Sequence, residues 1–301
     1  MITIPKALGF LVLSTVYFVS AAAVGGQEAT KSVNCNKRSL QHVIDRSKPG
    51  TLIKVSGTCN ELIDITTDNL TLDGRGKADI SGAGIVSTLP LVRISGASNV
   101  TIKGFTIHNA PRNGLVVRRG GSAVITGNTI SDNANNGILV HQSSSARVGS
   151  SRDNHALAGT PGSEGNVVEN NGGDGIVIRT ASSADMFHNI VRNNGLPANP
   201  SRGIFLEVGG SAFLSGNEIT SNTDRGVHAA TNASIRWSAD AFHQEQNLIQ
   251  LNGEGIVCRT GAAMSGNPQN FGVGNPGTGG TPHSDDTDIS GTCAISGALG
   301  F

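Results

Sequence analysis

Residues that could bind and deprotonate an acidic ligand recur at one position of the chain, four residues after a glycine that opens a short apolar segment. In four successive segments this position holds Arg118, His141, Arg179 and Glu207. Guanidinium groups bind carboxylates through paired hydrogen bonds, and a neutral histidine beside them can accept a proton. The flanking arginines should lower the pKa of His141 and keep its ring neutral. The pattern would suit removal of the proton next to a carboxylate, as in lyase or epimerase chemistry.

Four further residues would extend this site as ligand-binding groups. Phe205 and His228 stand two residues after such a glycine, whereas Asp174 and Arg202 directly precede one. A hydrolase would instead need two carboxylates at a defined separation, and the spacing singles out no such pair. The alternative interpretation is a solvated outer face, on which exposed ion pairs contribute little.

A glycine and asparagine repeat would position these residues. The apolar segments read GLVV, GILV, GIVI, GIFL, GVHA and GIVC, and each is followed downstream by two asparagines five residues apart. Without insertions, the first asparagine stands 14 residues after the glycine, as Asn128 does after Gly114. We expect the glycines to supply bends and the asparagines to form structural ladders between coils. The glycines of the repeat are Gly114, Gly137, Gly175, Gly203, Gly226 and Gly255.

The period predicts an all-β, single-stranded parallel β-helix with coils of about 23 residues. Each strand is too short to bury its own apolar side, so coils must stack about 4.8 Å apart and pair in parallel. Residues one and three after each glycine, such as Ile176 and Ile178, should point into the core, and residues two and four should point outward. The residues that could do chemistry would then form columns on one outer face.

Three insertions interrupt the repeat, and different sequences occupy its ends. The insertions are predicted at Ser150–Glu164, Leu196–Pro200 and Trp237–Gln246, and the sequence does not show whether the first and third line the same face. Ser39–Arg46 predicts a short amphipathic helix that caps the open end of the stack, and Thr51–Val55 the first strand. We expect the β-helix over 35–266 and an irregular tail over 267–301, with a final strand in Ile289–Ile295.

The N-terminal segment bears on the location of the protein, and the overall charge bears on its binding partners. Lys6 is the only charge before the uncharged run Ala7–Val24, so residues 1–24 predict a secretory signal peptide. Retention of this run as a membrane anchor is the alternative. Lys and Arg total 22, as do Asp and Glu, and this balance argues against the basic face of a nucleic-acid-binding protein. The oligomeric state stays open.

An even number of cysteines in an exported chain favours disulfides. Cys35 with Cys59, and Cys258 with Cys293, are the expected local pairs, and each would fix one end of the stack. Metal ligation and free buried thiols are the alternatives, although the chain has no Cys-x-x-Cys motif. We expect neither a metal nor a cofactor.

The run GTCNELIDITTDNLTLDG, the later SNVTIKGFTIHN and the repeated NGI-type strands resemble the right-handed β-helix repeat family of the pectin-lyase-like superfamily. The resemblance covers roughly residues 35–266. It implies a right-handed β-helix, a secreted or periplasmic location, and a polysaccharide as the partner, and the arginine positions favour an acidic one. Members include polysaccharide lyases, hydrolases and C5-epimerases, so the resemblance specifies the fold more closely than the activity.

The sequence departs from the well-characterised enzymes of that superfamily. It has no Asp-Pro-His-Asp run of the alginate-epimerase kind and no aspartate cluster resembling a pectate-lyase calcium site. Two hypotheses therefore stand. The first is a secreted β-helix that binds a polysaccharide and acts on it by lyase or epimerase chemistry. The second is a non-catalytic envelope or surface scaffold, or a protein-interaction β-helix.

Overall fold

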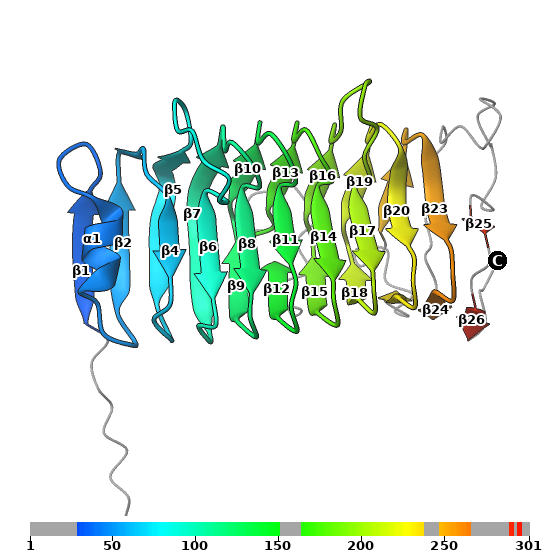
Figure 1. Cartoon of the computed structure of the whole chain (residues 1–301), viewed down its shortest axis with the longest axis horizontal. Coiled ribbons are helices and arrows are strands. Elements are labelled where there is room, and N and C mark those ends of the chain that lie inside the picture. The colour runs from blue at the N-terminus through cyan, green and yellow to red at the C-terminus, as the bar shows by residue number, and fades with distance from the viewer. Residues whose placement is uncertain (1–28, 151–163, 238–246, 266–288, 292–293, 297–301) are drawn as a thin grey trace, which may run out of the picture.

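The structure, a computed structural model, describes residues 29–150, 164–237, 247–265, 289–291 and 294–296. Its chain winds into coils that stack along one long axis, so that strands from successive coils lie side by side (Figure 1). Neighbouring strands pair in parallel from the first coil to the last. The predicted all-β parallel β-helix is confirmed.

One sheet of nine strands faces the viewer in Figure 1 and contains the apolar segments that follow the repeat glycines. Its strands are β4 (Ile63–Ile65), β6 (Val92–Ser95), β8 (Leu115–Arg118), β11 (Ile138–Val140), β14 (Ile176–Arg179), β17 (Ile204–Glu207), β20 (Arg225–Ala229), β23 (Glu254–Cys258) and β25 (Ile289–Gly291).

A sheet of 17 strands forms the rest of each coil and consists of two runs of strands. The first run comprises β1 (Thr30–Asn34), β2 (Leu52–Ser56), β5 (Thr71–Ser81), β7 (Val100–His108), β9 (Ser122–Thr126), β12 (Ser145–Gly149), β15 (Ser183–Phe187), β18 (Ser211–Ser215), β21 (Ser234–Trp237), β24 (Ala263–Ser265) and β26 (Ala294–Ser296). The second run comprises β3 (Thr58–Cys59), β10 (Thr129–Ser131), β13 (Val167–Glu169), β16 (Ile190–Arg192), β19 (Glu218–Thr220) and β22 (Leu248–Gln250). The long strands β5 and β7 extend across both runs.

The core lies inside the coils, where the predicted inward positions stack in register. Ile138, Ile176 and Ile204 occupy equivalent places on neighbouring strands and are 0% exposed. Their partners two residues later, such as Ile178, are equally buried. Burying an aliphatic side chain of this size stabilises a fold by about 1.5–3 kcal/mol, so the stack is held mainly by this interior.

Two asparagine ladders run along the coils, as predicted. The side-chain amide of Asn189 donates to the side-chain oxygen of Asn217 at 2.9 Å and to the carbonyl of Val148 at 2.9 Å. Equivalent bonds link the other members, which are nearly fully buried. The first ladder comprises Asn128, Asn166, Asn189, Asn217 and Asn247, and the second comprises Asn133, Asn171, Asn194, Asn222 and Asn252.

The repeat glycines have a packing role in addition to the predicted bend. None of them has the positive φ that favours glycine in a turn. A Cβ on Gly175 would instead lie 2.6 Å from a methyl carbon of Val191 and 2.7 Å from the carbonyl oxygen of Gly203. The predicted bend is confirmed at Gly114, Gly137, Gly175 and Gly203, whereas Gly226 and Gly255 lie within strands. Close packing against the core and the next coil, rather than a left-handed backbone, is what excludes a side chain.

Helix α1 (Leu40–Asp45) begins at the predicted N-cap Ser39, whose side chain accepts a hydrogen bond from the backbone of His42. The Gln41 side chain donates to the Asp64 carbonyl at 3.0 Å and accepts from the Asp64 amide at 2.7 Å. These two bonds pair the backbone groups of Asp64 at the edge strand β4, so the helix caps the nine-stranded sheet as expected.

The first strand begins earlier than predicted. β1 precedes the helix and pairs in parallel with β2, which includes most of the predicted first strand at Thr51–Val55. The expected disulfide between Cys35 and Cys59 is confirmed, with Cα atoms 4.8 Å apart. It ties the turn after β1 to β3 and therefore secures the first coil.

The C-terminal end differs in detail from the predictions. The single strand predicted in Ile289–Ile295 is two strands, β25 and β26, which add to β23 and β24. Cys258 is disulfide-bonded, and its predicted partner Cys293 lies outside the described residues. Trp237 belongs to β21 and is 1% exposed in the core, so its assignment to an insertion is wrong.

Most of the predicted insertions, and the predicted signal peptide at 1–24, lie outside the described residues. The strands that flank two of these insertions are β12 with β13 and β21 with β22, all members of the 17-stranded sheet. Residues Leu196–Pro200 are described and form a turn closed by hydrogen bonds between the backbones of Leu196 and Asn199, just before β17. This insertion therefore borders the nine-stranded sheet.

Candidate functional site

Arg118, His141, Arg179 and Glu207, which we call the charged column, lie on successive strands of the nine-stranded sheet. Arg179 and Glu207 are register partners on β14 and β17. The backbone amide of His141 donates to the carbonyl of Val117 at 2.9 Å, so the parallel pairing continues one residue beyond β11. The structure therefore brings these four residues together as predicted (Figure 1 shows β8, β11, β14 and β17 side by side).

His141 is a half-buried imidazole between two guanidinium groups. Burial lowers its pKa most, and the positive charges of Arg179 and Arg118 lower it further. The ring is therefore neutral near pH 7 and has a nitrogen lone pair that can accept a proton.

Arg118 differs from Arg93, Arg179, Arg202 and Arg225 because it forms no ion pair with any described carboxylate. Its Nε atom is buried and has no hydrogen-bond partner in the described part of the chain. Burial and the neighbouring charges of Arg119 and Arg93 lower its pKa. Arg179, by comparison, lies 3.4 Å from the carboxylate of Glu207 with much of its side chain exposed, a geometry typical of a weak surface pair. Arg118 is thus a cation with unused hydrogen-bonding capacity.

The predicted ligand-binding residues Phe205, His228 and Arg202 form a layered cluster beside the charged column. The Phe205 ring stacks on the His228 ring with centroids 5.0 Å apart, and the Arg202 guanidinium lies 4.1 Å from the Phe205 centroid. His228 is 5% exposed, and neither ring nitrogen has a hydrogen-bond partner among the described residues. Burial, followed by the charges of Arg225, Arg202 and Arg259, lowers its pKa to about 3.

Carboxylates on this face form ion pairs with arginines. Asp174 lies 3.1 Å from Arg202 and is 8% exposed, so burial raises its pKa even though the arginine opposes that shift. Glu254 lies 3.1 Å from Arg225, and Glu207 pairs with Arg179. These pairs do not form the two opposed carboxylates of a glycosidase, so the site is better suited to binding or to proton abstraction.

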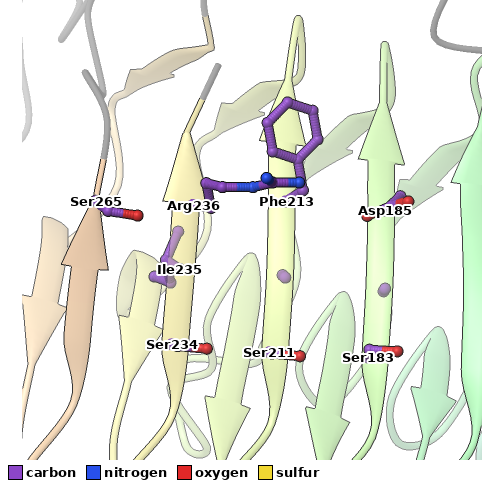
Figure 2. Close-up of a pocket in the computed structure, with 10 residues that line it drawn as sticks. Ser183, Asp185, Ser211, Phe213, Ser234, Ile235, Arg236 and Ser265 are labelled. Atoms are coloured by element: carbon purple, nitrogen blue, oxygen red, sulfur yellow. The ribbon is translucent and has the colours of Figure 1, made fainter. Parts of the chain in front are cut away.

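A groove on the 17-stranded sheet was missed by the sequence reasoning (Figure 2). It has a volume of about 360 Å³ and crosses β15, β18, β21 and β24. One wall is a row of serines in register, and the other carries residues of varied charge. The serine row comprises Ser145, Ser183, Ser211 and Ser234, and the opposite wall comprises Arg147, Asp185, Phe213 and Arg236.

The signal for this groove is present in the repeat. Each serine stands eight residues after a repeat glycine, as Ser183 does after Gly175, and the opposite wall stands two residues further on. The candidate site was predicted from the four residues that follow each glycine, and these do not include the serines.

Comparison with known proteins identifies the family. The model described as "Right handed beta helix region" matches residues 50–195, 92–242 and 158–280, which together span most of the chain. The chain belongs to this right-handed β-helix family. A search of curated protein sequences found no match.

Two solved structures are similar to this right-handed β-helix. Pectate lyase Pel9A is 12% identical, with a TM-score of 0.48, and the match covers 78% of this chain and 76% of the lyase. The A-module of the Azotobacter vinelandii mannuronan C-5 epimerase AlgE6 is 16% identical, with a TM-score of 0.40, and the match covers 73% of this chain and 70% of the module.

The described residues were also compared with the requirements of a metal site and of a membrane-spanning helix. Within them, no group of three or more His, Cys, Asp or Glu side chains is arranged to hold a metal ion. The described part also contains no helix that is long and apolar enough to cross a membrane.

Proposed function

We propose that this right-handed β-helix is a secreted protein that binds an acidic polysaccharide along the outer face of its nine-stranded sheet. The observation that carries the proposal is the unpaired guanidinium of Arg118 in register with neutral His141 and weakly paired Arg179. A polymer laid along the helix axis would cross these strands in turn, about 4.8 Å apart.

The local charge favours an acidic ligand. Arg93, Arg118, Arg119 and Arg179 lie at this end of the face, where Asp64 pairs with Arg93 and Glu207 pairs with Arg179. Arginine binds carboxylates through two parallel hydrogen bonds, and the partly exposed Arg118 side chain forms no ion pair with any described carboxylate. The disulfide between Cys35 and Cys59 supports an oxidising compartment, as expected of a secreted protein.

Binding is tested with uronate polymers and the Arg118→Ala variant. Each hydrogen bond to a charged group contributes about 1.5–3 kcal/mol, so the variant should bind at least about tenfold more weakly. Arg192→Ala, on the exposed side of β16, is the matched control and should bind like the parent protein. The proposal fails if no uronate polymer binds, or if Arg118→Ala binds as tightly as the control.

The neutral imidazole of His141 favours a second, catalytic candidate, namely lyase or C5-epimerase action on the bound polymer. In the lyase step, His141 takes the proton from the carbon next to the uronate carboxylate. The electron pair of that C–H bond forms the new C=C bond, and the glycosidic C–O bond breaks, with the leaving oxygen taking a proton from water. Arg118 or Arg179 would stabilise the negative charge that develops on the carboxylate. An epimerase would return a proton to the opposite face of the same carbon.

Ultraviolet absorbance of the unsaturated product tests the lyase, and exchange of solvent deuterium into the polymer tests the epimerase. Either signal should disappear in His141→Ala while binding remains. Binding without either signal would leave a non-catalytic surface scaffold, which is the alternative function. Unchanged turnover in His141→Ala would remove His141 as the base.

A further inference from the structure

The groove on the 17-stranded sheet is long and open and lies on a different sheet from the charged column. A second hollow of about 250 Å³ shares Ser183, Ala184 and Asp185 with the larger one, so the two form one continuous groove. It crosses the strands from β12 to β24, which are about 4.8 Å apart, and therefore extends over roughly 20 Å. A groove of this shape fits an extended polymer better than a compact small molecule.

The serine wall offers regularly spaced hydroxyl groups that the fold does not use. Ser145, Ser183, Ser211 and Ser234 are register partners, and their side chains alternate with buried alanines or isoleucine that point into the core. Ser183 and Ser234 are exposed in the groove, and among the described residues their hydroxyls have no hydrogen-bond partner. Coil stacking has already satisfied the strand backbones, so these hydroxyls can donate to and accept from a ligand.

The opposite wall combines an exposed carboxylate with oriented guanidinium groups. Arg147 and Asp185 are register partners but form no ion pair with each other or with other described residues. The guanidinium of Arg236 lies 4.7 Å from the centroid of the Phe213 ring, and Figure 2 shows it extending from β21 toward Phe213 on β18. Contact with the ring holds this guanidinium in place and leaves its edge available for hydrogen bonds.

The order of charges separates this groove from the charged column. Asp185 stands between Arg147 and Arg236 along the groove, so a chain with a carboxylate on every sugar would place negative charge against it. A chain of neutral sugars has hydroxyl groups alone, which can donate to the Asp185 carboxylate and accept from the serines and arginines. We propose that this groove is a second carbohydrate site, which binds a neutral polysaccharide parallel to the helix axis.

Calorimetry with hexasaccharides of glucose, mannose and xylose, and with hexagalacturonate as the acidic probe, tests the assignment on the full chain. At least one neutral probe should bind, and Ser183→Tyr, which fills the groove from an exposed strand position, should weaken that binding tenfold or more. Asp185→Ala should weaken it to a similar extent. Thr129→Tyr on β10, on the other run of the sheet, is the matched control and should bind like the parent protein.

Each other outcome overturns the proposal. These are failure of every neutral probe to bind, unchanged binding in Ser183→Tyr, and binding in the groove by the acidic probe alone. The test is independent of the proposed function, because uronate binding on the nine-stranded sheet should persist in Ser183→Tyr whichever result the neutral probes give.

Discussion

Removing one rung of an asparagine ladder should destabilise the protein much more than an ordinary surface change. The Asn189 side chain takes part in four hydrogen bonds. It accepts from the backbone and side-chain amides of Asn166 at 3.1 and 3.0 Å, and donates to Val148 and Asn217 at 2.9 Å each. In Asn189→Ala the backbone amide of Asn166 loses its side-chain acceptor, and the other three groups each lose a bond.

The magnitude follows from this count. A buried polar group left without a partner costs about 1–3 kcal/mol, and each of the remaining lost bonds contributes about 0.5–1.5 kcal/mol. We therefore expect Asn189→Ala to lower the free energy of unfolding by roughly 2.5–7.5 kcal/mol. A serine would not restore it, because its hydroxyl cannot span both neighbouring coils.

Urea unfolding followed by circular dichroism measures the effect. Asn193→Gly is the matched control, because Asn193 is exposed and has a φ of 54° that glycine adopts freely. The control should lose less than about 1 kcal/mol. If Asn189→Ala loses no more than the control, the ladder does not hold the coils together and our account of the repeat is refuted.

Three more predictions concern packing, acid stability and the N-terminal disulfide. Gly175→Ala should lower the free energy of unfolding by about 1–3 kcal/mol in the same urea assay, since its Cβ would meet Val191 and Gly203; an unchanged midpoint would contradict the packing argument. The pKa of His228 is about 3 in the folded protein and 6.5 ordinarily, so the unfolded chain binds a proton first as the pH falls and stability should decline through this window. His228→Gln should flatten that part of the pH profile of the urea midpoint, and an identical slope in the variant would argue against the shift. Replacing both Cys35 and Cys59 by alanine should cost roughly 3 kcal/mol, seen as a lower melting temperature; equal melting of the two proteins would show that this disulfide adds nothing.

The repeated part of the molecule could be predicted well, because the same residue types occur at the same positions in several successive coils. Isoleucines one and three residues after a glycine indicate the core, and asparagines at a fixed distance indicate the ladders. The register that aligns Arg118, His141 and Arg179 followed directly from that spacing.

Features without a repeat were harder to predict. β1 precedes the helix and has no equivalent glycine, so nothing in its sequence marked it as the first strand. Trp237 resembled part of an insertion because the following repeat is displaced, yet its side chain fills the core. The close packing at the glycines could not be predicted from the sequence, since a missing Cβ suits a bend and a close contact equally and only the bend was expected.

The roles of the charged residues depend on pairing, which spacing alone does not give. Arg118 and Arg179 occupy equivalent positions in the repeat, but only Arg179 has a glutamate on the next strand. The difference between an occupied and an available guanidinium therefore appeared only in three dimensions.

The crystal structure of the full chain with an acidic hexauronate tests our central claim most directly. We predict that the sugar chain lies across β8, β11 and β14, with one carboxylate on the guanidinium of Arg118 and a neighbouring sugar against His141. A hexauronate bound only elsewhere on the protein, with Arg118 untouched, would contradict the proposed function.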